Sequence, residues 1–199
     1  DLTMHLAEVA RISTVPHSLI RLGDGSIGYI TRRIDRTPNG EKIDMEDMCQ
    51  LTLHPTEYKY RSSYEQIAKV IAAHSSTPKL CLVNFMQLIL FCYLTGNNDM
   101  HLKNFSLYAP KSNYMLTPAY DLLNVVIVNP KDKEELALTL NGKKSRLQKR
   151  DFVAAAQKMG IDEKAIDKMI ISFNRIMPKW TSWINSSFLS DELKQKYID

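Results

Sequence analysis

The chain has 199 residues, 44% of them hydrophobic, and its 26 lysines and arginines against 22 acidic residues give a formal net charge of +4. This length corresponds to one large domain or two small ones, and the hydrophobic content is enough to fill a core, which excludes a mainly disordered chain. So small a charge excess is weak evidence for a nucleic-acid partner, because such proteins concentrate basic residues on one face. Three cysteines without a CxxC spacing argue against a disulfide framework or a structural zinc site, and they indicate a reducing, cytoplasmic compartment.

The first part of the sequence predicts one helix followed by a β-hairpin. Apolar residues at helical spacing begin at Leu2, and the helix is expected to end before Val15-Pro16. Two β-rich runs, residues 17–22 and 26–34, flank Asp24-Gly25, a dipeptide that suits a tight hairpin turn. No charged segment leads into an apolar one at the start, so no signal peptide is expected, and a first residue of Asp1 suggests a trimmed chain.

Helical patterns dominate the middle of the chain, over residues 45–51, 63–74 and 80–94. The last of these is mostly apolar, but Asn84 and Gln87 interrupt it and it is shorter than the roughly 20 residues that span a bilayer. We therefore expect a buried helix rather than a membrane span.

A second mixed region follows the apolar helix. Residues 105–109 and 114–117 are expected to form a short hairpin, and residues 136–140 a strand that ends at Asn141-Gly142. Four further helices are predicted, over residues 149–159, 162–177, 179–187 and 191–197.

Residues 96–104, GNNDMHLKN, form a polar segment between the apolar helix and the first strand of that hairpin. Polar groups held between two core elements must be satisfied by partners. Asp99 and Asn104 have the D-x-x-x-x-N spacing of a kinase catalytic loop, and the hairpin is expected to return Asp121 beside Asn104 as a third oxygen ligand for Mg²⁺. The alternative is structural: Asp99 caps or turns the chain, Asn104 satisfies backbone groups, and Asp121 caps a helix.

Four strings resemble the HipA-like serine/threonine kinases of bacterial toxin–antitoxin systems, in that family's order and with about its spacing. They are TRRIDR (31–36), EDMCQ (46–50), GNNDMHLKNFSLY (96–108) and LTPAYDLL (116–123), with NGKKSRLQKRDF (141–152) similar to a further family segment. The resemblance covers nearly the whole chain, and its combination of DxHxKN with TPxYD is specific.

The resemblance implies an α+β, mainly α fold: the helical C-terminal lobe of an atypical protein-kinase-like fold, with a small β element at the N-terminal end. Residues 1–36 are then the remnant of the smaller lobe and the hinge, and residues 37–199 the helical lobe. The implied activity is ATP- and Mg²⁺-dependent transfer of phosphate to a protein serine or threonine. A DNA-binding antitoxin is the implied partner, with DNA bound indirectly or weakly and no membrane involved; the family's substrates are aminoacyl-tRNA synthetases.

The same resemblance assigns roles to individual residues. Asp99 is expected to be the catalytic base, and Asn104 and Asp121 to hold Mg²⁺. The expected nucleotide-binding residues are His101 and Lys103 in the first motif, Tyr120 beside the metal-binding Asp121, and the hinge residues Arg32, Arg33 and Ile34.

The sequence also departs from the family pattern. The family's hinge usually carries an acidic residue and an aromatic where this chain has Arg32 and Ile34, so adenine packing is expected to be weaker. The family's phosphate loop and ATP-positioning lysine precede the first helix, and this chain is expected to lack both. The GDGSIG string of residues 23–28 matches G-x-G-x-x-G, but its order relative to the hinge is wrong for a kinase loop, and it is interpreted as a hairpin turn.

Three other groups of residues stand out in the sequence: a basic run, four aromatic residues and three histidines. The basic run Lys143, Lys144, Arg146, Lys149 and Arg150 is interpreted as a solvated face, with a DNA-holding patch as the alternative. Phe173, Trp180, Trp183 and Phe188 are expected to be core aromatics rather than partner-docking ones. His5, His54 and His74 are interpreted as isolated, with no i,i+4 partner for a metal, and receive no metal role.

Two rivals to an active kinase remain. The first is a catalytically incomplete binding module that docks an antitoxin or a complementary polypeptide. The second is a helix-turn-helix regulator built on residues 149–177, which the apolar residues Ile161, Ile166 and Ile170 disfavour.

Overall fold

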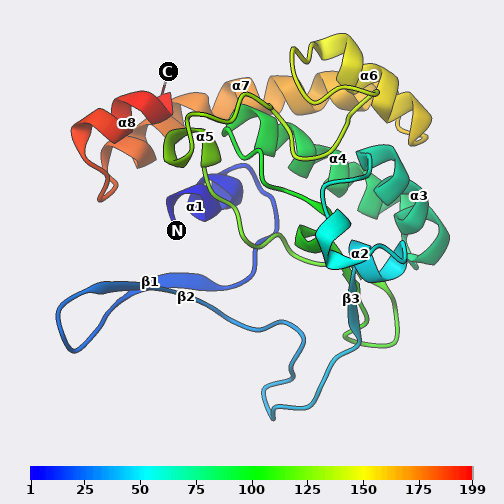
Figure 1. Ribbon diagram of the computed structural model, residues 1–199, viewed down its shortest axis with the longest axis horizontal. Coiled ribbons are helices and arrows are strands. Elements are labelled where there is room, and N and C mark those ends of the chain that lie inside the picture. The colour runs from blue at the N-terminus through cyan, green and yellow to red at the C-terminus, as the bar shows by residue number, and fades with distance from the viewer. Residues whose placement is uncertain (199) are drawn as a thin grey trace.

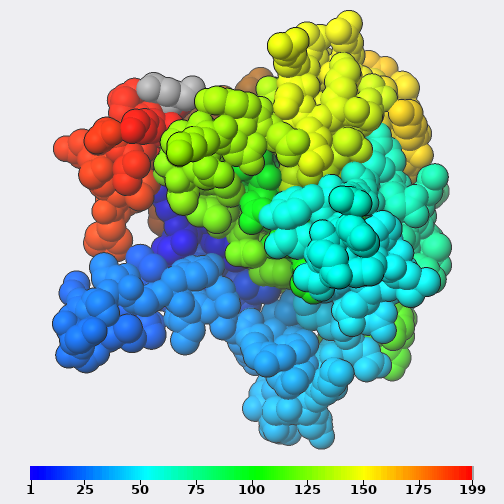
Figure 2. Space-filling view, in the orientation of Figure 1, coloured from blue at the N-terminus to red at the C-terminus, as the bar shows by residue number. Residues whose placement is uncertain are grey.

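The computed structural model describes residues 1–198. A helical body surrounds the buried helix α4 (Pro78–Leu94), and a β-hairpin extends away from that body in Figure 1. Figure 2 shows the same hairpin as a blue projection beside the body. No helix among residues 1–198 has both the length and the apolar character needed to cross a membrane. The expected fold class, mainly α with small β elements, is confirmed.

The core forms around α4, as its apolar sequence predicts, and Pro78 occupies its first turn, where a missing N–H costs nothing. Helix α3 (Tyr64–His74) packs beside it, and the Ser63 side chain caps α3 by accepting from the Gln66 backbone N–H. Phe85 of α4 stacks edge-on against Phe105, with ring centroids 5.1 Å apart.

The N-terminal helix α1 (Leu2–Val9) belongs to this body. The indole N–H of Trp180, in α7 (Glu163–Asn185), donates to the Leu6 carbonyl oxygen at 2.9 Å, and Trp180 packs edge-on against Phe91 of α4. Helices α6 (Lys149–Lys158) and α8 (Asp191–Ile198) pack against α7. Helix α1 thus shares the core of the helical body. The division into two domains at residue 36 stays a prediction.

Two small antiparallel sheets complete the fold. Strands β1 (His17–Arg21) and β2 (Ile27–Thr31) pair to form the projecting hairpin, and Gly25 at its turn has φ +85°. The predicted hairpin turn at GDGSIG is therefore confirmed. In the second sheet β4 (Ser106–Tyr108) lies between β3 (Met45–Asp47) and β5 (Met115–Leu116).

Three predicted elements were wrong. Residues 45–51 are not one helix: β3 pairs with β4, and α2 (Met48–Leu51) begins at Asp47, which caps it. Residues 136–140 are buried but lie in bends and isolated bridges, since they have no adjacent strand to extend a sheet. The predicted break at Pro178 is absent because α7 runs through it; Pro178 is exposed, so water can reach the backbone oxygen that loses a donor.

The short elements that remain are 3-10 helices η1 (Thr56–Tyr58) and η2 (Leu102–Asn104) and helix α5 (Val125–Val128). Cys49, Cys81 and Cys92 are all free and buried. Of the four aromatics expected in the core, Phe173 and Trp180 are buried, but Trp183 is 45% and Phe188 86% exposed, so the prediction was wrong for these two.

Three lysines of the basic run pair with acidic residues, Lys143 with Asp151, Lys144 with Glu134 and Lys149 with Asp167.

Candidate active site

The polar segment of residues 96–104 lies between α4 and β4 and is largely buried, as expected. Gly96 ends α4 with φ +65°, and a Cβ there would lie 3.0 Å from Asn124 Oδ1. Only glycine combines this backbone angle with so close an approach. Asn97 and Asn98 are 1% and 4% exposed, and Asn98 Nδ2 donates to the Glu134 carbonyl oxygen at 2.8 Å. The sharp turn at Gly96 thus begins a buried polar loop.

Asn104 and Asp121 come together across the β4–β5 hairpin, as the sequence predicted. Asn104 Nδ2 donates to Asp121 Oδ2 at 2.7 Å, and Asn104 Oδ1 accepts from the His101 backbone N–H at 3.2 Å. The backbone of Asp121 has φ +59°, a left-handed conformation that aspartate tolerates better than most residues. The structural alternative is half right, since Asn104 does satisfy a backbone group, but Asn124 rather than Asp121 caps α5.

Asp99 accepts a hydrogen bond from the Tyr60 hydroxyl, with the two oxygens 2.5 Å apart. Burial, together with that hydrogen bond to the carboxylate, raises the pKa of Tyr60 to about 12. Tyr60 could not be identified from the sequence, because it lies 39 positions from Asp99 and no local motif links the two.

His101 lies close to both carboxylates. Its ring packs edge-on against the Tyr60 ring at 4.9 Å. Burial lowers the pKa of His101, and nearby Lys59 lowers it further, while Asp99 and Asp121 act in the opposite direction. The Nδ1 atom of His101 is buried and has no hydrogen-bond partner. The environment of His101 therefore favours its neutral form, and the ring is near enough to Asp99 and Asp121 to interact electrostatically with both.

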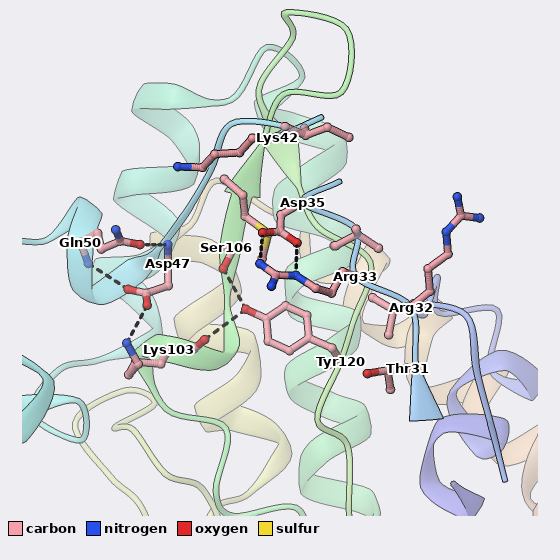
Figure 3. Close-up of a pocket in the computed structure, with 14 residues that line it drawn as sticks. Thr31, Arg32, Arg33, Asp35, Lys42, Asp47, Gln50, Lys103, Ser106 and Tyr120 are labelled. Carbon is pink, nitrogen blue, oxygen red and sulfur yellow. Dashed lines mark hydrogen bonds and ion pairs between the residues drawn. The ribbon is translucent and has the colours of Figure 1, made fainter. Parts of the chain in front are cut away.

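A pocket of about 400 Å³ adjoins this loop (Figure 3). Five predicted nucleotide-binding residues line it: Arg32, Arg33, Ile34, Lys103 and Tyr120. The other predicted site residues, Asp99, His101, Asn104 and Asp121, do not line it, although Lys103 and Tyr120 directly precede Asn104 and Asp121 in the chain. The predicted residues thus form two adjoining groups.

Hydrogen bonds fix the wall of the pocket nearest the loop. Lys103 Nζ donates to Asp47 Oδ2 at 2.9 Å, and Asp47 also caps α2. The Tyr120 hydroxyl donates to the Lys103 carbonyl oxygen at 3.1 Å and lies 2.8 Å from the Ser106 hydroxyl oxygen. Burial raises the pKa of Tyr120 to about 12, so this hydroxyl keeps its proton. Asp47, Lys103, Ser106 and Tyr120, which lie together in Figure 3, are therefore already paired.

The hinge side of the pocket carries less free positive charge than its sequence suggests. Arg33 binds Asp35 through two hydrogen bonds, at 2.9 and 2.6 Å. These bonds hold the pKa of Asp35 at about 2. Arg32 extends away from the other labelled residues in Figure 3.

The side chains of Asn104 and Asp121 suit a divalent cation. Carboxylate and amide oxygens are hard donors, and Mg²⁺ is commonly held by one or two such protein ligands together with phosphates and water. Asn104 and Asp121 carry such oxygens on side chains that are in contact, with the Asn104 amide nitrogen facing Asp121 and its oxygen facing the His101 N–H.

Residues 1–180 match the family model described as the HipA-like C-terminal domain. A Sinorhizobium fredii protein named "Putative kinase Y4dM" is 30% identical over 166 residues, which cover 82% of this chain and 39% of that protein. A Haemophilus influenzae protein named "Putative kinase" is 30% identical over 125 residues, 55% of this chain and 36% of that protein. The chain spans less than half the length of these relatives.

Two solved structures have the same fold. A chain of the Shewanella oneidensis MR-1 toxin–antitoxin complex of HipA, HipB and operator DNA superposes with a TM-score of 0.83 at 21% identity, covering 99% of this chain and 51% of that one. The Helicobacter pylori proinflammatory kinase CtkA superposes with a TM-score of 0.60 at 15% identity, covering 99% of this chain and 75% of that one. Both likenesses show a kinase-like fold.

Proposed function

This chain belongs to the HipA-like C-terminal domain family, and from that premise we propose that it carries the magnesium and nucleotide site of a protein serine/threonine kinase. The observation that supports this most is the 2.7 Å contact between Asn104 and Asp121. It places two hard oxygen-bearing side chains together at the end of the loop that contains Asp99, beside a pocket large enough for part of a nucleotide.

In the proposed mechanism the hydroxyl oxygen of the substrate attacks the γ-phosphorus of ATP, and Asp99 accepts the hydroxyl proton. The bond between the γ-phosphorus and the oxygen that bridges it to the β-phosphate breaks, so ADP leaves. Asn104 and Asp121 would hold Mg²⁺, and the ion would supply positive charge to neutralise the charge that develops on the phosphates. The Tyr60 hydroxyl occupies one oxygen of Asp99 in the structure. The substrate hydroxyl must therefore displace Tyr60 or use the other carboxylate oxygen.

The pocket is proposed to take the nucleoside portion. Backbone and side-chain groups of Arg32, Arg33 and Ile34 line the side expected for adenine, while Lys103 and Tyr120 line the side next to the metal ligands. With Lys103 paired to Asp47, its role is to fix the wall of the pocket rather than to offer a free cation.

A second candidate is a binding module that docks an antitoxin or a complementary polypeptide. The HipA relative of known structure is in a complex with HipB and operator DNA, and we propose a DNA-binding antitoxin as the partner here.

Isothermal titration with ATP tests the metal site, using the chain, Asp121→Asn and the control Asp191→Asn, whose carboxylate is fully exposed. We expect Mg²⁺ to strengthen ATP binding in the parent and the control, and this gain to disappear in Asp121→Asn. Equal loss with Mg²⁺ and with EDTA would assign Asp121 a purely structural role.

The Asp99→Asn variant separates binding from chemistry. It is expected to bind Mg²⁺-ATP as the parent does and to lose transfer of the γ-phosphate to a serine-rich protein such as casein, measured with labelled ATP. Parent-level transfer by Asp99→Asn would contradict the kinase proposal. Heat of Mg²⁺-ATP binding without transfer in the parent would favour the binding module.

A further inference from the structure

Four titratable side chains form a closed cluster where α1 meets β1. His5 Nε2 lies 3.3 Å from Asp1 Oδ2, and its Nδ1 lies 3.2 Å from Glu8 Oε2. His17, at the start of β1, contacts the same two acids, with Nδ1 3.1 Å from Asp1 Oδ1 and Nε2 3.3 Å from Glu8 Oε1. The prediction that His5 is isolated was therefore wrong. His17 is twelve positions away in the sequence, but the fold places its ring beside that of His5.

The geometry is that of a small metal site. One ligand atom from each of Asp1, His5 and His17 lies within 4.8 Å of the other two. Zn²⁺ binds imidazole nitrogen and carboxylate oxygen at about 2.0–2.1 Å, so neighbouring ligands of a tetrahedral ion are about 3.3 Å apart. The separations of 3.1 Å from His17 Nδ1 to Asp1 Oδ1 and of 3.3 Å from His5 Nε2 to Asp1 Oδ2 are close to that edge.

Glu8 occupies the position of a supporting carboxylate. It contacts the ring nitrogen of each histidine that faces away from Asp1. A metal-binding histidine usually donates its other N–H to a carboxylate, which fixes the tautomer and orients the ring. His5 makes such a hydrogen bond to Glu8, and His17 Nε2 lies 3.3 Å from the other Glu8 oxygen without the hydrogen-bond geometry.

The hydrogen bonding of the cluster is incomplete as it stands. A neutral imidazole has one donor and one acceptor, and a carboxylate oxygen accepts only, so a neutral ring between two carboxylates satisfies one of them. The side chain of His17 is 1% exposed, and its Nε2 is buried without a hydrogen bond of acceptable geometry. A cation bound by the lone pairs of His5 Nε2 and His17 Nδ1, the nitrogens that face Asp1, would leave the other nitrogen of each ring protonated and free to donate to Glu8.

We propose that Asp1, His5 and His17 bind a divalent transition-metal ion, with Zn²⁺ the best fit, and that Glu8 orients the two histidines. Three protein ligands leave a fourth position for water or another donor. None of the four residues lines the pocket beside Lys103 and Tyr120, so this site is separate from the proposed kinase site.

The surroundings indicate what the ion would do. Trp183 of α7 stacks on His5 with ring centroids 5.1 Å apart, and Tyr29 of β2 lies 6.2 Å from His17 by the same measure. An ion held by α1 and β1 would join the projecting hairpin to the helical body at its base. We therefore assign it a structural role, which is to fix the direction of the hairpin.

Titration with Zn²⁺ and with Co²⁺ tests the proposal, using metal-free chain, His17→Gln, Glu8→Gln and the control His74→Gln, an exposed histidine on α3. The parent and the control are expected to bind one ion that a large excess of Mg²⁺ does not displace, and bound Co²⁺ is expected to show visible d–d bands. His17→Gln should abolish this binding, and Glu8→Gln should weaken it by about 10–100-fold.

Two further measurements keep the result unambiguous. Asp121→Asn, at the proposed Mg²⁺ site, should bind Zn²⁺ as the parent does, and circular dichroism should show that His17→Gln remains folded. Absence of Zn²⁺ binding in the folded parent, or equal binding by parent and His17→Gln, would overturn the proposal and leave a cluster of ion pairs.

Discussion

Replacing Tyr64 by phenylalanine tests whether a buried hydrogen bond from Tyr64 fixes the position of the candidate catalytic loop. Tyr64 is fully buried, and its hydroxyl donates to the Met100 carbonyl oxygen at 3.2 Å. Burial raises the pKa of Tyr64 well above its ordinary value, so this hydroxyl remains a donor. Met100 directly follows Asp99, so the change removes one tether of the loop and keeps the ring that packs edge-on against Phe105.

The expected cost follows from what is left unpaired. Met100 is 1% exposed, and losing its donor leaves a buried carbonyl group unsatisfied, which costs about 1–3 kcal/mol. A 3.2 Å bond is a long one, so we expect the lower part of this range, about 1–2 kcal/mol. For a chain of this size that corresponds to a fall in Tm of about 2–8 °C.

Urea unfolding and a thermal scan measure the stability of Tyr64→Phe, and ATP-dependent phosphate transfer measures its activity. The control is Tyr58→Phe, which removes the hydroxyl of a 41% exposed tyrosine. We expect a loss of both stability and kcat in Tyr64→Phe and of neither in the control. Parent-level stability would refute the reasoning that this hydroxyl satisfies the Met100 carbonyl.

Three further changes probe other parts of the structure. Gly96→Ala forces a Cβ to 3.0 Å from Asn124 at a positive φ and should lower the free energy of unfolding by about 1–3 kcal/mol, measured in urea; an unchanged midpoint would contradict this. Lys103→Met breaks a partly exposed ion pair worth about 0–1 kcal/mol, so titration should show weaker nucleotide binding at nearly unchanged Tm; unaltered ATP affinity would remove Lys103 from the pocket's function. Lys143 holds the pKa of Asp151 at about 2, below its ordinary 3.8, so this carboxylate stabilises the fold above about pH 4 and stops doing so as the pH falls to about 2. The stability difference between the parent and Asp151→Asn should therefore shrink over that interval in pH-dependent unfolding, and a constant difference would exclude the link.

Local patterns predicted the elements whose signals lie within a few residues. Apolar spacing gave α3 and α4, and Asp24-Gly25 gave the hairpin turn. The meeting of Asn104 and Asp121 was also predictable, because a short hairpin returns the chain beside its own start.

What the sequence could not predict depends on distant partners. Residues 45–47 form a strand because β4 lies beside them, while the apolar run at residues 136–140 has no such neighbour. Helix α7 continues through Pro178 because Phe173 and Trp180, on either side of it, are both anchored in the core. The Tyr60–Asp99 and His5–His17 pairs likewise come from separate elements, so no local spacing reveals them.

The hydrogen bond between Asn104 and Asp121 also bears on how the proposed Mg²⁺ would enter the site. The amide nitrogen of Asn104 now faces the carboxylate and gives it a donor. Binding of the ion would require the Asn104 side chain to present oxygen instead of nitrogen, which would release the His101 backbone N–H that this oxygen now accepts from. Ion uptake would thereby be coupled to the conformation of the loop that carries Asp99.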